Sequence, residues 1–286
     1  MSAPSTEITS RDAVVDAVRE LLDNLPDKPG LEASRDEGRA VAAIIEPFGL
    51  PSDIVGAVYA YPAFREGFLD PKAIEIRDLK ELPRLFLGLK QLDEFSLPRH
   101  WQPGEALAVQ QSEALRKMLL AVVSDVRLVL VRIADQLNRL REAKNASEAV
   151  REAIALETRE IYAPLANRLG VWQLKWELED LAFRYLEPDT YGEIASALKE
   201  KRDDRVDFIE EFQETLQREL QAEGIEAEIT GRPKHIYSIW RKMRRKDRGI
   251  EALYDIRAVR LLVDTVGDCY AALGIVHNLW SYIPGE

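Results

Sequence analysis

The sequence predicts a mainly α-helical first part followed by the start of an α/β part. Through the first half of the 286 residues, apolar side chains recur at the three- and four-residue spacing of a helix face. Few stretches with the alternating pattern of a strand occur before residue 220. Beyond that point, two strand-like runs are separated and followed by helical ones, which is typical of an α/β unit.

The individual elements follow from this periodicity and from the prolines and glycines that interrupt it. In the first half we expect helices over 13–22, 39–45, 106–123 and 126–141, with breaks at 26–30, 49–51, 62 and 98–104. A polar join, 142–150, precedes helices over 151–167, 171–185 and 191–223. Strands are expected over 225–229, before a Thr230-Gly231 turn, and over 256–263, with helices over 234–245 and 266–280.

Composition limits the class of protein. The net charge of −11 argues against a general affinity for nucleic acids or membranes. The single cysteine, Cys269, excludes an internal disulfide and fits a reducing cytoplasm, where we expect the protein to reside. The polar N-terminus predicts no signal peptide, and the apolar run 118–137 is interrupted by charges too often to span a bilayer.

Some side chains are expected to form core. Trp172, Trp176, Phe183 and Tyr185 recur at roughly helical spacing, and Cys269 and His277 lie on an apolar helical run. We expect all six to be buried.

The segment GRPKHIYSIWRKM, residues 231–243, carries the strongest functional signal. A helix that begins near Pro233 would gather Arg232, Lys234, Ser238 and Lys242 around its first turns, and such a helix start binds phosphate well. Residues 231–248 hold eight Lys or Arg against one acid, a charge of +7, which leaves −18 for the rest of the chain. A solvated basic face, with its aromatic residues in the core, is the alternative. Phosphate, RNA and an acidic partner all fit the charge.

Longer motifs help to decide among phosphate, RNA and an acidic partner as the ligand of this segment. The runs GRPKHIYSIWRKM, LYDIRAVRLLV (253–263) and DCYAALGIVHNLW (268–280) closely resemble the synthetase domain of the RelA/SpoT family, whose members make the alarmone (p)ppGpp. The run IYAPLANRLGVWQLKWELEDLAFRYLEP (161–188) is similar to the family's preceding helices. The resemblance implies a degenerate HD-type helical domain over 1–150. Connecting helices and the first part of an α/β nucleotidyltransferase-like synthetase domain would then occupy 151–286.

The resemblance also implies a reaction and residues for it. Family synthetases transfer a pyrophosphoryl group from ATP to the 3′-hydroxyl of GTP or GDP. Arg232 would stack on adenine, and Lys234, Ser238 and Lys242 would hold the ATP phosphates. Asp255 would be the catalytic Mg²⁺ carboxylate, with a turn-closing aspartate as the alternative. His235 would be structural or orienting.

The hydrolase pattern of bifunctional family members is broken here. Those enzymes hold Mn²⁺ with a His, a His-Asp pair and a distant Asp, and these positions fall at Glu37, Ala60-Tyr61 and Asp135. The acidic pair that would activate water falls at Phe64-Arg65. The three histidines, His100, His235 and His277, show no metal-ligand spacing. We therefore expect no Mn²⁺ site, no hydrolase activity, and an Asp135 that caps a helix or pairs with Arg132 or Arg139.

Family members continue with segments that this chain does not contain. One carries the guanine-stacking tyrosine and another a second metal-binding glutamate, while C-terminal domains sense uncharged tRNA on the ribosome. We therefore expect residues 1–286 to be an inactive fragment, with a part after residue 220 that is mobile, rearranged or paired with another copy.

A regulatory module that binds a nucleotide or partner without turnover is the alternative function. The hypothesis of an RNA-binding domain has less support, because no RNP- or KH-type motif occurs in the sequence.

Overall fold

The computed structural model describes residues 7–70, 72, 74, 79–93, 125–200, 202–250, 253 and 257–281. It divides into two compact units, Met1–Leu186 and Glu187–Glu286, which are considered separately. The mainly helical fold class expected from the sequence is confirmed. None of the helices described is long and apolar enough to cross a membrane.

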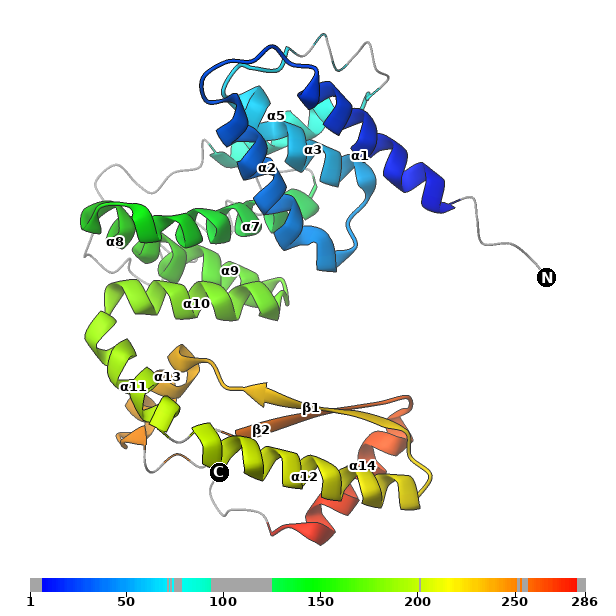
Figure 1. Ribbon diagram of the computed structural model, residues 1–286, viewed down its shortest axis with the longest axis vertical. Coiled ribbons are helices and arrows are strands. Elements are labelled where there is room, and N and C mark those ends of the chain that lie inside the picture. The colour runs from blue at the N-terminus through cyan, green and yellow to red at the C-terminus, as the bar shows by residue number, and fades with distance from the viewer. Residues whose placement is uncertain are drawn as a thin grey trace, which may run out of the picture. The chain divides into compact units, whose positions relative to one another are not determined.

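The first unit is helical throughout its described residues (Figure 1). Its α-helices are α1 (Glu7–Asp23), α2 (Leu31–Ile45), α3 (Ser52–Arg65), α5 (Leu82–Asp93), α7 (Arg127–Glu142), α8 (Glu148–Glu157), α9 (Ala163–Arg168) and α10 (Trp172–Leu186). Two 3₁₀ turns, η1 (Glu46–Phe48) and η2 (Ala143–Asn145), and a π-helical turn, η3 (Thr158–Tyr162), complete it.

One continuous core joins these helices. Val18 of α1, Leu31 of α2 and Ile54 of α3 are fully buried in it. A Cβ on Gly38 of α2 would lie 2.6 Å from the carbonyl oxygen of Tyr59 in α3, so only glycine permits this close helix contact. The tight packing of α2 on α3 fixes the positions of the polar residues that both helices carry.

The described residues of the second unit form two antiparallel strands and four helices. The helices are α11 (Pro188–Glu200), α12 (Arg202–Ala222), α13 (Ile236–Lys246) and α14 (Val266–Leu279), and the strands are β1 (Ala227–Pro233) and β2 (Arg257–Val263). Ala227 pairs with Val263 at one end of the ladder and Pro233 with Arg257 at the other. A small core formed around Leu216, Leu220 and Ala272 packs α12 and α14 against the strands.

The expected elements agree with the structure in part. The helix over 126–141 is α7, the helix over 266–280 is α14, and the helix over 234–245 is α13. Two expected helices are divided: 151–167 becomes α8, η3 and α9, and 191–223 becomes α11 and α12. The helix expected over 106–123 lies outside the described residues.

Two local expectations were wrong. Thr230-Gly231 is not a turn, because both residues pair within β1, with Arg260 and Val259 of β2. The break expected at Pro62 is absent, because Pro62 lies in the last turn of α3 and its carbonyl still accepts the N–H of Glu66 at 3.0 Å.

Burial corrects three further expectations. Trp172 is 49% exposed, because it stands in the first turn of α10, where its ring lies tilted against Trp176 and beside the Lys175 ammonium group. Cys269 and His277 are exposed on α14, whose buried contact within the second unit is made by Ala272. Phe183 is buried as expected.

The division between the units falls after Leu186, whereas the sequence led us to divide the chain at residue 150. Helices α8, α9 and α10, which we had grouped with the second domain, pack onto the core of the first unit through residues such as Tyr162, Leu165 and Leu178. The assignment of domains by function remains a prediction.

Candidate functional site

The basic segment of the second unit lies where β1 leads into α13. Lys234 and His235 follow the strand, and His235 is the N-cap residue of α13. Ser238 stands in the first turn, and Lys242 follows it by four residues, on the same helix face. Lys234, Ser238 and Lys242 are each partly exposed. Lys234 and Ser238 therefore lie at the start of α13, and Lys242 lies one turn further along the same helix face as Ser238.

The rest of α13 strengthens this positive charge. Arg244, Arg245 and Lys246 occupy its last turn, and Ile239 is its only buried side chain among the described residues. The rings of Tyr237 and Trp240 lie 5.4 Å apart, and the Arg244 guanidinium lies 5.6 Å from the Trp240 ring. These two aromatic residues are partly exposed, not core.

Two predicted residues of this site have no side-chain description. Arg232 pairs with Ala258 in the β1–β2 ladder, three residues before the helix N-cap, and nothing further is stated of its side chain. Asp255 lies outside the described residues, two residues before β2 begins.

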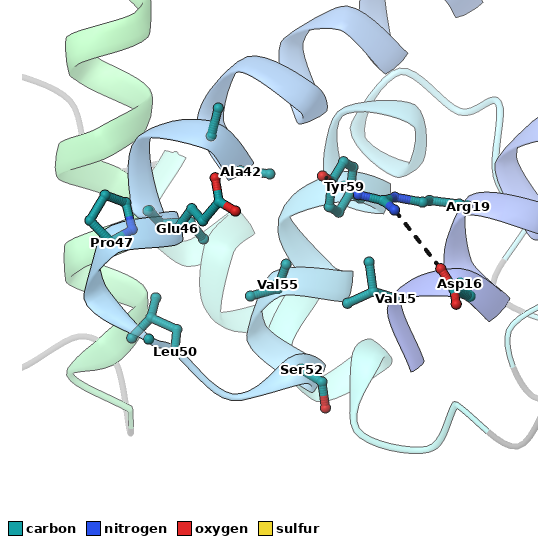
Figure 2. A pocket seen from close by; sticks show the side chains of 13 residues that line it. Val15, Asp16, Arg19, Ala42, Glu46, Pro47, Leu50, Ser52, Val55 and Tyr59 are labelled. Carbon is teal, nitrogen blue, oxygen red and sulfur yellow. Dashed lines mark hydrogen bonds and ion pairs between the residues drawn. The ribbon is translucent and has the colours of Figure 1, made fainter. Parts of the chain in front are cut away.

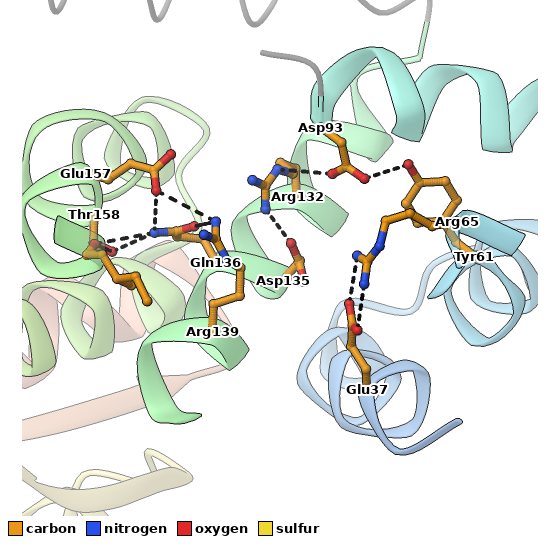
Figure 3. Close-up of polar contacts among 11 residues, drawn as sticks. Glu37, Tyr61, Arg65, Asp93, Arg132, Asp135, Gln136, Arg139, Glu157 and Thr158 are labelled. Carbon is orange, nitrogen blue, oxygen red and sulfur yellow. Dashed lines mark hydrogen bonds and ion pairs between the residues drawn. The ribbon is translucent and has the colours of Figure 1, made fainter. Parts of the chain in front are cut away.

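The positions that match the hydrolase pattern converge in the first unit (Figure 3). Glu37 comes from α2, Ala60 and Tyr61 from α3, and Asp135 from α7. Ala60 is fully buried and offers no ligand atom. The Arg65 guanidinium donates two hydrogen bonds to Glu37, with Nη1–Oε1 and Nη2–Oε2 distances of 3.0 and 2.8 Å.

Tyr61 and Asp135 are engaged with other side chains. The Tyr61 hydroxyl donates to Asp93 at 2.6 Å, and burial together with this bond raises the pKa of the phenol well above its usual value. Arg132 donates to Asp135, lies 3.7 Å from Asp93, and covers the ring of Tyr162 at 5.3 Å. The expected pairing of Asp135 with Arg132 is confirmed. Burial raises the pKa of the Asp135 carboxyl, and the Arg132 charge opposes that rise.

These residues line a small, partly open cavity, here called the Asp135 pocket. It is lined by Glu37, Val41, Val58, Tyr61, Pro62, Arg65, Leu89, Asp93, Val131, Arg132 and Asp135. Its volume of about 30 Å³ admits a water molecule, whereas pockets for ligands of drug size begin near 300 Å³. Over the described part of the chain, no group of three or more His, Cys, Asp or Glu residues is placed to hold a metal ion.

Sequence reasoning missed Asp93, which belongs to this pocket. The signal available was a carboxylate in the last turn of the apolar run 82–93, where the helix dipole is unfavourable for a negative charge. Contacts with Tyr61 and Arg132 compensate for that position.

A second, larger cavity of the first unit contains no predicted site residue (Figure 2). About 600 Å³ in volume, it is bounded by α1, the end of α2 with η1, and the first half of α3. Its apolar walls include Val15, Leu50 and Val55. Glu46 and Asp16 lie on opposite sides in the view, and Arg19 rests on the Tyr59 ring, 4.8 Å from its centre. We refer to it as the α1 pocket.

Comparison with known proteins assigns the family. A family model described as "HD domain" matches residues 16–172, and one described as "Region found in RelA / SpoT proteins" matches residues 231–286. The chain belongs to the RelA/SpoT family. The HD match covers α2, α3 and α7, which carry the Asp135 pocket, and the second match covers α13.

Three curated relatives illustrate the RelA/SpoT family. A "GTP pyrophosphokinase" of Photobacterium angustum is 42% identical over 249 residues, 87% of this chain and 33% of the relative. One of Escherichia coli is 52% identical over 182 residues, 64% of this chain and 24% of the relative. A "Probable guanosine-3′,5′-bis(diphosphate) 3′-pyrophosphohydrolase" of Synechocystis is 39% identical over 248 residues, 86% of this chain and 32% of the relative.

The chain thus spans about a quarter to a third of the length of these RelA/SpoT relatives. Their names include both a synthetase and a hydrolase, so similarity alone does not assign the reaction.

Proposed function

We propose that this protein is a GTP pyrophosphokinase that transfers a pyrophosphoryl group from ATP to the 3′-hydroxyl of GTP or GDP. The observation that supports this most is the cluster of Lys234, Ser238 and Lys242 at the start of α13, within the RelA/SpoT match. Lys234 and Ser238 at a helix N-terminus, with Lys242 one turn further on, would provide the charge and the donors that ATP phosphates require. Arg232, from the adjacent strand, would contact the adenine.

Phosphoryl transfer also requires neutralisation of the charge that develops on the phosphates. Mg²⁺ would supply this when bound, and Asp255 is the residue proposed to hold it. Lys234 and Lys242 would orient the same phosphates, so their contribution extends to the ground state of bound ATP.

Substitutions in the full-length protein test these roles separately. Asp255→Ala should abolish formation of ppGpp and pppGpp, measured with labelled ATP by chromatography, since loss of a metal carboxylate costs several kcal/mol of transition-state stabilisation. Lys242→Ala should mainly weaken ATP binding. Arg241→Ala, an exposed cation on the same helix, is the matched control and should change little. Near-normal synthesis by Asp255→Ala would contradict the metal role.

We also propose that the first unit does not hydrolyse the alarmone. Three features of the positions that match the hydrolase pattern support this. Glu37 is bound by Arg65, which stands where an activating acid would be needed. Ala60 offers no ligand atom, and Tyr61 is a donor to Asp93, not a metal ligand. Labelled ppGpp incubated with the protein and Mn²⁺ should release no pyrophosphate above background.

A second candidate function is a binding module without turnover, and the α1 pocket favours it. Its volume of about 600 Å³ falls within the range of small-molecule sites. Asp16 and Glu46 give the lining two acids against the single cation Arg19, which suits a neutral or cationic ligand better than a nucleotide. Val55→Trp should fill this pocket. A ligand whose binding is lost in that variant, with synthesis unchanged, would establish the second function beside the first.

A further inference from the structure

Glu37 and Arg65 form a bidentate ion pair between two helices. Glu37 lies in α2 and Arg65 is the last residue of α3, and both nitrogens at the end of the guanidinium donate to the carboxylate. The Nε atom of Arg65 also lies 3.1 Å from Glu66, which holds the guanidinium from its other side. Parallel charge-assisted bonds of this kind have a defined geometry and are stronger than neutral hydrogen bonds.

Exposure places this pair at the mouth of the Asp135 pocket. The side chains of Arg65 and Glu37 are 36% and 27% exposed, whereas those of Asp135 and Arg132 are 16% and 9% exposed. The pocket walls Val41 and Val58 are nearly inaccessible. The pair therefore stands between solvent and the more deeply buried polar and apolar lining (Figure 3).

The positive charge of Arg65 is needed to balance the carboxylates that line the Asp135 pocket. Three carboxylates, those of Glu37, Asp93 and Asp135, line the cavity beside two guanidinium groups, those of Arg65 and Arg132. Without Arg65, three negative charges would share one cation in a partly buried space. Like charges close together at reduced dielectric repel, so α2 would be pushed away from the pocket.

We propose that the Glu37–Arg65 pair is a gate that restricts access to the deeper lining of the Asp135 pocket. Breaking the pair opens the pocket further to solvent while the core of the first unit stays folded. This proposal does not depend on the synthetase function or on any ligand.

Cysteine labelling measures the opening directly. In a Cys269→Ser background, which removes the native exposed thiol, Val58→Cys reports on the pocket wall. Val129→Cys, fully buried in the same unit and not part of the lining, reports on loosening of the core. A bidentate pair of this strength should shift the opening equilibrium about tenfold, so Arg65→Ala should accelerate labelling at position 58 about tenfold and leave position 129 unchanged.

Two controls complete the design. Arg141 makes an equally bidentate pair with Glu177, at 2.7 and 2.8 Å, away from the pocket, so Arg141→Ala should leave labelling at position 58 unchanged. Glu37→Gln, which keeps the size of the side chain but removes a negative charge, should accelerate labelling less than Arg65→Ala does, because the ion pair is lost without added repulsion. The reversed pair, Glu37→Arg with Arg65→Glu, should return labelling toward the slow rate. The proposal is overturned by unchanged labelling at position 58, by equal acceleration at position 129, or by failure of the reversed pair to slow labelling.

Discussion

Replacement of Arg132 by methionine should destabilise the first unit strongly. The Arg132 side chain is 9% exposed and pairs with Asp135, whose side chain is 16% exposed. Methionine replaces the apolar stem of arginine but removes the guanidinium group and its charge, so Asp135 is left buried opposite an apolar group. Breaking a buried ion pair from one side costs about 3–5 kcal/mol, because the remaining charge has lost its compensation.

This loss of stability can be measured as a fall in the midpoint of thermal unfolding, Tm. For a unit of this size, each kcal/mol lowers the midpoint by about 2–4 °C, so Arg132→Met should lower Tm by about 6–20 °C at neutral pH. Circular dichroism at 222 nm detects the loss of helix directly.

The effect should also depend on pH with a defined sign. Burial already raises the pKa of Asp135, and without Arg132 it rises further. A carboxyl whose folded-state pKa lies above its unfolded value of about 3.9 contributes full stability below that value, and the contribution is lost as pH rises through the folded-state pKa. The variant should therefore be closer to wild type at pH 5 than at pH 8.

A second substitution separates charge from packing. Asp135→Asn in the Arg132→Met background removes the uncompensated charge and should recover a large part of the lost Tm. If Arg132→Met lowers the free energy of unfolding by less than about 1 kcal/mol, the size found for exposed ion pairs, the reasoning is refuted. An equal loss of stability at pH 5 and pH 8 would refute it as well.

Three further predictions concern the same unit. Gly38→Ala should destabilise it by about 1–3 kcal/mol in denaturant unfolding, because the new methyl would meet the Tyr59 carbonyl; a neutral effect would mean that α2 and α3 separate easily. Tyr61→Phe should cost about 1.5–3 kcal/mol, the value of a hydrogen bond to a charged group, and Tyr59→Phe, at a half-exposed position, is the milder control. Removal of divalent metal with EDTA should leave Tm unchanged, since Asp135 is paired with Arg132; a fall in Tm would show that a metal stabilises the fold.

The elements that the sequence located well are those with a clear contrast between apolar and polar faces. In α7, buried residues such as Ile133, Leu137 and Leu140 recur at helical spacing beside polar positions, and the expected bounds differ from the observed ones by one residue. The ends of α14 were placed equally closely, because Thr265 caps its first turn.

Helix α3 shows why some helices were not predicted from the sequence. Its buried residues, among them Ala57, Ala60 and Ala63, lie around most of its circumference, so the sequence shows no amphipathic period. Pro62 suggested a break, yet a proline in the last turn disturbs few backbone hydrogen bonds. Burial on several sides by α1, α2 and α5 is a tertiary property that local pattern does not contain.

The residues of the candidate sites also fall into some that the sequence predicted and some that it did not. The hydrolase pattern of the RelA/SpoT family, laid on the sequence, pointed to Glu37, Tyr61 and Asp135, and the structure brings them around one pocket. The partners that determine what these residues do were not predictable from spacing alone, because Asp93 and Arg132 reach them from other helices.

The pocket differs from a metal site that has only lost its ligands. Simple loss would leave Asp93 and Asp135 as buried charges without compensation, which costs several kcal/mol per ion. Each instead faces a guanidinium or a phenol, and Glu37, at the position where bifunctional family members have a histidine ligand, pairs with Arg65. These contacts join α2 to α3, α3 to α5, and α5 to α7. Helices that a metal ion would hold through shared ligands are here joined by side-chain pairs, so we expect the first unit to fold without a bound metal.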